Sequence, residues 1–520
     1  MVKFLSSRSH RLSVSLAGYL LAVSVLPLAG CALPSLQGRA DTTTIPETDT
    51  TRLARAIAPS LRANPGKSGV HSLSAAEEAF AVRARLAAAA ERSIDVQYYM
   101  WHGDTTGMLL FEALCQAAQR GVRVRLLLDD SNTAGLDRTI AQLAAQPNIQ
   151  VRLFNPLINR RARWTNFVFD FPRINHRMHN KSFTVDNQMT VIGGRNIGDE
   201  YFNADDNLEF VDLDLLAMGP VVNEVSRLFD QFWNSASAYP AELIVGNASP
   251  ADAETRLQRA FAAARADPKA ARYVPMMRGN PLTDELTDHR LDFQWSNVRL
   301  VADDPQKVFA ANRELLLLPR LFEITGTPDS RFDLVSAYFV PTKLGVVSFQ
   351  AMAKRHVQVR VLTNSLASND VAAVHVGYAK RRRALLRAGV RLFELKSVDS
   401  APRLRGRGSS AGSLHAKTFE IDDSQLFIGS FNFDPRSARL NTEMGMVVEN
   451  AAMSQGLRQY FDTRMPLTAY EVKLTPDGRK LEWIETTVEG QKILTREPGV
   501  GLFRRALVGF LSLLPIDWLL

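Results

Sequence analysis

Residues 179–186 read HNKSFTVD, and the same pattern returns at residues 415–422 as HAKTFEID. Each stretch leads into a glycine turn, GGRN at 193–196 and GSFN at 429–432. The histidine stands 14 positions before the first glycine in both copies (179 to 193 and 415 to 429) and 17 before the asparagine (179 to 196 and 415 to 432). One His-x-Lys pair is common on solvated strands, whereas two copies with matched spacing indicate an internal repeat that builds one site from two halves.

The apolar pattern around each copy alternates between strands and helices. In the first half we expect strands at 94–99, 122–129 and 149–154 and a helix at 108–120. In the second half we expect strands at 332–338, 357–363 and 390–395 and helices at 344–355 and 371–388. This alternation is typical of an α/β fold, and we predict two α/β/α sandwich halves with largely parallel sheets.

Composition divides the chain into six segments. We expect a signal peptide at 1–30, a flexible tether at 31–72, a first half at 73–235, a helical connecting segment at 236–325, a second half at 326–465 and a C-terminal extension with a hydrophobic end at 466–520. Ser74 and Glu77 have the spacing of a capping box, so folding is expected to begin there with an alanine-rich helix.

The N-terminus has the features of a secretory signal. Three basic residues precede an apolar run at 12–28, and the sequence LAGC ends this run at Cys31. The ending resembles the bacterial lipoprotein box, which implies that Cys31 is acylated; the alternative is a plain signal anchor. The other cysteine, Cys115, lies in a helical apolar pattern and is expected to be a small buried side chain.

Composition and charge are those of a folded protein with a basic surface. Hydrophobic residues make up 46% of the chain and charged residues 22%, which excludes disorder as the state of most of it. The net charge of +8 suits anionic lipid and nucleic acid equally. Charge alone therefore does not choose between these partners.

The residue types of the two copies suit phosphodiester chemistry. Residues i and i+2 of a strand face the same side, so His179 and Lys181 are expected to meet one phosphate together, as are His415 and Lys417. An imidazole attacks phosphorus or protonates a leaving oxygen, and a lysine offsets the charge that grows on the phosphate oxygens. The neutral donors expected beside them are Asn196, Ser430 and Asn432. Two such sets supply one nucleophile and one general acid without a metal or another cofactor.

With its doubled His-x-Lys-x4-Asp pattern and glycine turns, the sequence resembles the phospholipase D superfamily over residues 75–465. The resemblance implies one active site at the interface between two pseudo-symmetric halves. It also implies that His179 forms a covalent phosphohistidine and that His415 protonates the leaving alcohol. Asp186 and Asp422 are then expected to support the fold of the site.

In that superfamily an acidic residue about 28–32 positions after each histidine orients the imidazole of the other copy. On this count Glu443 and Glu209 are expected to hold the two rings. Asp212 and Asp214 lie close to Glu209 in the sequence and remain alternatives to it. A surface acid at a strand edge is the other interpretation of Glu209.

Three stretches are similar to bacterial cardiolipin synthases, particularly those of the C type: RMHNK at 177–181, GGRNIGDEYF at 193–202 and NSLASND at 364–370. This resemblance implies a phosphatidyltransferase that acts on phosphatidylglycerol, and the alternative is a phospholipase D-type hydrolase that uses water as acceptor. It implies anionic phospholipid substrates, a membrane surface as partner and no nucleic acid, and it leaves protein partners open. Together with Cys31 it implies a lipid-anchored protein of the bacterial cell envelope that faces the periplasm.

Two other classes of function fit less well. Nucleases of the superfamily are commonly short chains with one motif, and a lipid-binding protein without activity predicts a damaged motif. Here both motifs are intact in one chain. Neither class is therefore favoured.

Two segments outside the motifs suit a membrane boundary. Residues 160–177 interleave five arginines with four aromatic residues, and residues 501–520 are largely apolar but too short after their arginines to span a bilayer. A packed helix with a solvated basic edge and a buried core helix are the respective alternatives. The arginines at 403–407 are expected to close over substrate or remain solvated, and those at 381–383 to form a solvated helix face.

Overall fold

The computed structural model describes residues 33–204, 210–279, 282–288, 290–309, 312–397, 413–487 and 489–513. The predicted signal peptide, Cys31, Glu209 and the arginines at 403–407 lie outside the described residues. Cys115 is buried, as predicted, and burial raises the pKa of its thiol to about 12. Within the described ranges we find no helix with the length and hydrophobicity needed to cross a bilayer.

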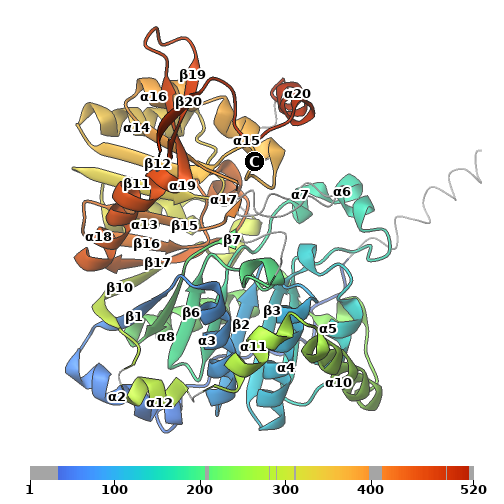
Figure 1. Cartoon of the computed structure of the whole chain (residues 1–520). Helices are drawn as coiled ribbons and strands as arrows, with labels where there is room; N and C mark the ends of the chain where they lie inside the picture. The colour runs from blue at the N-terminus through green and yellow to red at the C-terminus, as the bar shows by residue number, and fades with distance from the viewer. Residues whose placement is uncertain are drawn as a thin grey trace, which may run out of the picture.

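The chain folds into two halves that lie one above the other in Figure 1, each built on a mixed sheet. The strands of the first half are β1 (Ser68–Leu73), β2 (Ser93–Tyr98), β3 (Arg123–Asp129), β4 (Ile149–Phe154), β5 (Ser182–Val185), β6 (Met189–Gly193), β7 (Phe210–Val211), β8 (Asp214–Met218) and β9 (Ala238–Pro240). Those of the second are β10 (Gln294–Ala302), β11 (Arg331–Ser336), β12 (Gln358–Asn364), β13 (Arg391–Leu395), β14 (Ser413–Leu414), β15 (Lys417–Ile421), β16 (Gln425–Gly429), β17 (Met444–Glu449), β18 (Ala469–Leu474), β19 (Leu481–Thr487) and β20 (Gly490–Leu494). Because β10 pairs with both β1 and β17, one sheet runs through both halves.

The two sheets have the same strand order, which confirms the prediction of two α/β halves. The order β8-β6-β5-β2-β3-β4-β9 corresponds to β17-β16-β15-β11-β12-β13-β18. Only β2-β3-β4 and β11-β12-β13 are parallel within these two orders, so the expectation of largely parallel sheets is wrong. Short hairpin turns make the β5–β6 and β15–β16 pairs antiparallel, and the strands on either side of these hairpins also pair antiparallel.

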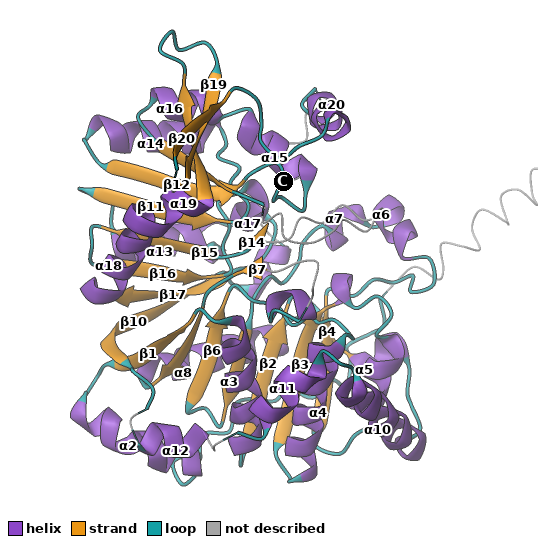
Figure 2. Ribbon diagram, in the orientation of Figure 1, coloured by secondary structure: helices purple, strands orange, loops and turns teal. Residues whose placement is uncertain are grey.

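Helices cover both faces of each sheet (Figure 2). The helices of the first half and the connecting segment are α2 (Arg52–Ala63), α3 (Ala76–Ala89), α4 (Thr105–Gln119), α5 (Asp137–Ala144), α6 (Asn166–Phe169), α7 (Phe171–Ile174), α8 (Pro220–Trp233), α9 (Ala241–Val245), α10 (Pro250–Ala266), α11 (Ala270–Met277) and α12 (Leu282–Thr287). Those of the second half are α13 (Leu317–Thr325), α14 (Lys343–Lys354), α15 (Ala372–Ala379), α16 (Arg382–Arg387), α17 (Pro435–Arg439), α18 (Ala451–Gln459), α19 (Met465–Thr468) and α20 (Leu502–Leu511).

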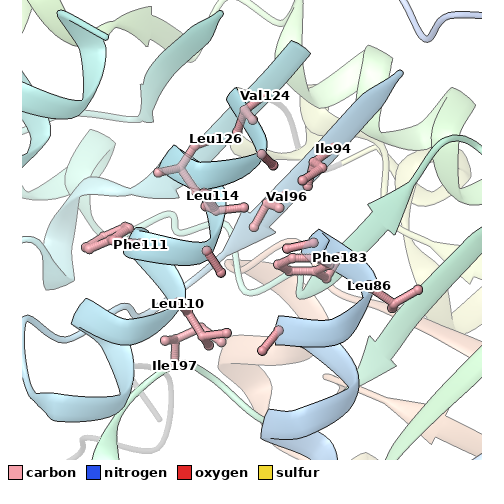
Figure 3. Packing of buried hydrophobic residues seen from close by; sticks show 14 of the residues in the cluster. Leu86, Ile94, Val96, Leu110, Phe111, Leu114, Val124, Leu126, Phe183 and Ile197 are labelled. Carbon is pink, nitrogen blue, oxygen red and sulfur yellow. The ribbon is translucent and has the colours of Figure 1, made fainter. Parts of the chain in front are cut away.

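Alternate strand residues supply the cores on the two faces. In the first half, α3 and α4 pack on one face, where Leu86, Leu114, Val96 and Phe183 belong to one cluster (Figure 3). The helix α8 covers the other face, and its core continues into the second half. The halves are therefore joined by buried apolar side chains, which fixes the geometry of anything built at their interface.

The predicted tether is wrong over its C-terminal part. Residues 52–63 form α2, and residues 68–73 form β1, which pairs with β8 and β10. In the strand sequence SGVHSL only Val70 and Leu73 are large and apolar, and both are fully buried. The strand forms because sheet partners from distant parts of the chain cover it, which a local pattern does not reveal.

Strands also extend past the predicted segment boundaries. β9 adds an edge strand to the first sheet beyond residue 235, and β18, β19 and β20 extend the second sheet beyond residue 465. The segment predicted to be helical at 236–325 contains β10 in addition to its helices. The first sheet is thus one strand longer than expected at this edge, and the second sheet is three strands longer.

Two local predictions differ as well. The helix α3 begins after Ala75 without a side-chain cap, so the capping box at Ser74 is wrong. The single helix expected at 371–388 is two helices, α15 and α16, and Arg382 at their junction is buried rather than solvated. Arg382 contacts Glu394 (3.1 Å) and Glu497 (2.6 Å), and these carboxylates compensate the buried charge.

Candidate active site

Each motif histidine lies in the loop that enters a hairpin, just before β5 or β15. The backbone of this loop pairs with the opposite half. The His179 N–H donates to the Thr442 carbonyl (2.9 Å), and the His415 N–H donates to the Val211 carbonyl (2.9 Å). β7 and β14 extend the second of these contacts as a short parallel pair. The repeated sequence therefore places the two histidines at the interface between the halves.

The ring of His179 is held by a carboxylate from the other half. Its Nδ1 lies 2.8 Å from Oε2 of Glu443 and 3.1 Å from the carbonyl oxygen of Ser430. The hydroxyl of Ser430 donates to the same Glu443 oxygen. This is the contact predicted for Glu443, and it fixes both the tautomer and the orientation of the ring.

The ring of His415 is held in the same way, by Asp212. Its Nδ1 lies 2.6 Å from Oδ2 of Asp212, which comes from the first half. The contact predicted for Glu209 is therefore made by Asp212, one of the two neighbours weighed as alternatives. Glu209 itself lies outside the described residues.

The sheet register explains why counting from the histidine missed Asp212. Asp214 pairs with Gly193, and Asp212 lies two residues before it. In the second half Gly445 pairs with the motif glycine of β16, and Glu443 again lies two residues before it. The segment before β8 is longer than the corresponding segment before β17. The position of the acid is therefore constant relative to the strand and not relative to the histidine.

The two motif lysines are buried and repel each other. Lys181 Nζ donates to the His179 carbonyl (2.7 Å), and Lys417 donates to the His415 carbonyl in the same manner. Desolvation lowers the pKa of Lys181 well below its ordinary value and that of Lys417 to about 8, and the charge of Lys417 adds to the effect on Lys181. An anion between the halves would relieve this repulsion, so the site has the electrostatics of a phosphate site.

Burial also sets the protonation of the histidine–carboxylate pairs. Desolvation, reinforced by the lysines, lowers the pKa of His179 well below its ordinary value and that of His415 to about 4. Desolvation raises the pKa of Glu443 to about 7. The pKa of Asp212 is lowered, because His415 and Lys417 outweigh its desolvation. Both rings are therefore neutral near pH 7 in this site, while Asp212 is charged.

The motif aspartates hold backbone rather than facing the histidines. Asp186 accepts the N–H groups of three consecutive residues, 91–93, at 2.8–3.0 Å. Asp422 accepts those of residues 329–331 at 2.7–2.9 Å. Both have a positive φ, 51° and 53°, at the tip of a motif hairpin. Each aspartate therefore fixes its hairpin to the strand beside it, β2 or β11.

The predicted neutral donors lie at the two ends of the motif sets. Ser430 contacts Glu443, as described. Asn196 donates from Nδ2 to the hydroxyl of Tyr201 (2.8 Å), and Asn432 accepts the N–H of Tyr338 (3.3 Å). These contacts orient both amides, and a role in holding substrate stays a prediction.

Tyrosines that the sequence did not single out complete the surroundings of the rings. Tyr99 meets His179 edge to face at 4.9 Å between ring centroids, and Tyr201 meets His415 at 5.1 Å. The Lys181 ammonium lies 5.4 Å from the centre of the Tyr99 ring. Their positions in the sequence could have identified them, because Tyr99 directly follows β2 and Tyr201 lies in the stretch after the first glycine turn.

One group among the described residues has the spacing of metal ligands. Nitrogen or oxygen atoms of His102, Asp104 and Glu200 all lie within 4.8 Å of one another. Asp104 already accepts the N–H groups of Gly107 (3.0 Å) and Asp199 (2.7 Å). Local backbone contacts thus account for the position of Asp104.

Two half-sites on a two-fold α/β scaffold, each with one histidine and one lysine, define a phosphatidyltransferase or phosphodiesterase of the phospholipase D superfamily. The family model described as "Cardiolipin synthase, PLD-like domain" matches residues 83–233 and 323–465. The chain belongs to this family, which confirms the resemblance drawn from the motifs.

Known proteins agree with this assignment. Cardiolipin synthase C of Escherichia coli (strain K12) is 45% identical over 474 residues, which cover 90% of this chain and 100% of that protein. Cardiolipin synthase A of Pseudomonas entomophila (strain L48) is 26% identical over 74% of this chain and 67% of that protein. The crystal structure of phosphatidylserine synthase from Haemophilus influenzae Rd KW20 has the same fold, with a TM-score of 0.55, 12% identity, and coverage of 90% of this chain and 100% of that one.

Proposed function

We propose that the protein forms cardiolipin by moving a phosphatidyl group onto phosphatidylglycerol through a phosphohistidine. The observation that carries the proposal is the crossed arrangement of the site, in which each half supplies one histidine and one lysine and the carboxylate that holds the other half's ring. The relative named cardiolipin synthase C, which matches nearly the whole chain, supports the choice of lipid.

The first step transfers the phosphatidyl group to the enzyme. Nε2 of His179 attacks phosphorus, a P–N bond forms, and the bond from phosphorus to the headgroup oxygen breaks. His415 gives its proton to that oxygen, so the headgroup leaves as a neutral alcohol. Lys181 and Lys417 offset the charge on the phosphate oxygens throughout.

The second step releases the product. A glycerol hydroxyl of phosphatidylglycerol gives its proton to His415 and attacks phosphorus. The P–N bond breaks, and His179 is regenerated as a neutral ring. Because Glu443 holds Nδ1 of His179, the lone pair that forms the P–N bond is the one on Nε2.

Asymmetry between the two pairs supports this division of roles. The charge of Asp212 favours the protonated form of His415, whereas Glu443, with its pKa raised to about 7, does so less for His179. A bound phosphodiester also offsets the lysine charges and so raises the pKa of His415 from about 4. His415 is therefore the better proton donor, and His179 the better nucleophile.

A product assay tests the proposal. The purified full chain is incubated with phosphatidylglycerol vesicles, alone and with a second phospholipid of different acyl length, and lipids are separated by mass. We expect cardiolipin, whose chain composition identifies donor and acceptor. Phosphatidic acid without cardiolipin would show the hydrolase alternative, with water as the acceptor, and would overturn the proposal. A His179→Ala/His415→Ala double variant is the control for contaminating activity.

Substitution of Asp212 is expected to impair proton transfer. Asp212→Asn removes the charge that raises the pKa of His415, so we expect the rate at neutral pH to fall by about 10²–10³-fold. His415 must be protonated for the first step, so the alkaline limb of the pH–rate profile moves to lower pH. Rates across the pH range measure both effects. Glu209→Gln is the matched control, and we expect its rate to stay within about twofold of wild type. If Glu209→Gln lowers the rate more than Asp212→Asn does, the orienting role belongs to Glu209.

The proposal also places the protein in the bacterial cell envelope, facing the periplasm. Its support is the signal-like stretch at 1–30 and the lipoprotein-like box that ends at Cys31. We expect mass spectrometry of the protein from its native membrane to find a first residue Cys31 that carries acyl chains. An unmodified Cys31 on the mature protein would remove the lipid anchor.

A further inference from the structure

Two segments on one side of the molecule expose aromatic side chains. The first, called the arm, comprises residues 159–175 with α6 and α7, and the second is α20. Exposed fractions are 68% for Trp164 and 81% for Phe169 in the arm, and 84% for Phe503 and 62% for Phe510 in α20. Large apolar groups exposed together on a folded protein mark an interaction surface.

Most charges of the arm are paired within the protein, whereas its aromatic side chains are exposed. Arg160 forms ion pairs with Asp130 and Asp137, and Arg163 lies 3.0 Å from Asp137. Asn166 is buried and donates from Nδ2 to the carbonyl oxygens of Asn159 and Arg163. Arg160 and Arg163, predicted from the sequence to meet lipid headgroups, instead fix the base of the arm, and the exposed aromatic side chains lie beside one exposed arginine, Arg161.

The same inversion holds for α20. Arg504 donates to the Asn369 carbonyl (2.5 Å), and Arg505 donates to the Glu497 carbonyl (2.8 Å). The aromatic residues of this helix are on its exposed side. A helix that rests in water turns its arginines outward and its aromatic residues inward. The orientation seen here is that of a helix whose outer side meets an apolar medium.

Both segments are attached directly to the active site. The arm runs into Arg177, which contacts Asp129 (3.2 Å) two residues before His179. On the other side, Asn369 binds α20 and precedes Asp370, which accepts the Tyr338 hydroxyl (2.8 Å). Figure 1 shows α6, α7, α15 and α20 on the same side of the molecule. The two apolar segments therefore flank the two halves of the site.

We infer that the arm and α20 are the contacts with which the protein lies on a phospholipid bilayer, so that a headgroup enters the site while its acyl chains stay among the lipids. This inference rests on the proposed function. A bilayer covers two separate apolar segments at once, and Trp and Phe are side chains that enter its interfacial region. The positive net charge of the chain adds attraction to anionic lipid.

The test compares lipid in vesicles with lipid in solution. Three variants of the full chain are made: Trp164→Ser/Phe169→Ser in the arm, Phe503→Ser/Phe510→Ser in α20, and Phe322→Ser. The last is the control, because Phe322 is 48% exposed on α13, which lies on the opposite side in Figure 1. Each is assayed on dioleoyl phosphatidylglycerol vesicles and on monomeric dihexanoyl phosphatidylglycerol.

We expect the arm and α20 variants to lose about tenfold or more of the rate on vesicles, since each burial of an aromatic side chain is worth about a factor of ten in partitioning. On the monomeric lipid they are expected to remain within about twofold of wild type, as the control is on both substrates. Equal losses on both lipids, or no loss on vesicles, would overturn the inference. If the product is phosphatidic acid in place of cardiolipin, the proposed function is contradicted. The ratio of the rate on vesicles to the rate on monomeric lipid still tests whether the arm and α20 contact the bilayer.

A second readout needs no activity. Brominated phospholipid quenches an indole that enters the bilayer, and we expect Trp164→Phe to remove the most strongly quenched part of the tryptophan fluorescence of the full chain on such vesicles. Unchanged quenching would contradict the inference. A second contradicting result would be a dimer, detected by sedimentation, that dissociates in the arm and α20 variants. A second copy of the chain would then cover these side chains.

Discussion

His415→Ala is expected to slow transfer between natural phospholipids by about 10²–10⁴-fold, and His179→Ala by about 10⁴-fold or more. The difference follows from their proposed roles. Without His415 the leaving alkoxide has no proton donor, but the nucleophile remains. Without His179 there is no atom to form the covalent intermediate.

A substrate with a better leaving group separates the two roles. The p-nitrophenyl ester of phosphatidic acid releases an anion that needs no proton, so the first step should survive in His415→Ala. The second step still lacks its base, and the phosphoenzyme should accumulate. We expect a burst of nitrophenolate equal to the amount of enzyme from His415→Ala and none from His179→Ala. Stopped-flow absorbance measures the burst, and mass spectrometry of digested protein locates the phosphatidyl group.

The reverse pattern would exchange the roles of the two histidines. Two-fold geometry allows this exchange, since Nδ1 of each ring contacts a carboxylate of the other half. What breaks the symmetry is the charge on those carboxylates. A burst from both variants would mean that either ring forms the intermediate and that the charge of Asp212 does not decide the roles of the two histidines.

The sequence predicted the halves and the meeting of their motifs because the repeat is encoded in exact spacing. It placed Glu443 correctly but not Asp212, since the count from histidine to acid is preserved only where the intervening loop keeps its length. The register of β8 against β6 is the property that both copies share. Locating such a residue requires the strand pairing and not the motif alone.

Residues whose partners are distant in sequence account for the other errors. β1 has a weak apolar pattern and forms because β8 and β10 lie on either side of it. Arg382 is buried because Glu394 and Glu497, the latter more than a hundred residues away, receive its charge. A local pattern shows what a side chain tolerates, whereas these positions depend on what the fold brings beside them.

Asp186→Ala is expected to destabilise the first half by about 2–4 kcal/mol. The substitution removes a fully buried carboxylate and leaves three N–H groups, those of residues 91–93, without their acceptor. It also places alanine at a φ of 51°, which costs about 1 kcal/mol more than an aspartate or asparagine there. Asp186→Asn keeps one acceptor oxygen and tolerates this backbone, so we expect about half the loss.

Asp422 is the internal control for this prediction, because it makes the same three backbone contacts at an exposed edge. Water replaces the carboxylate there, so Asp422→Ala should cost about 1 kcal/mol. Urea unfolding followed by circular dichroism measures both variants. If the two variants lose the same stability, the contribution of the motif aspartate comes from the backbone conformation of the hairpin and not from burial. If Asp186→Ala instead abolishes activity without loss of stability, the aspartate acts in the chemistry and its assignment as a support of the hairpin is wrong.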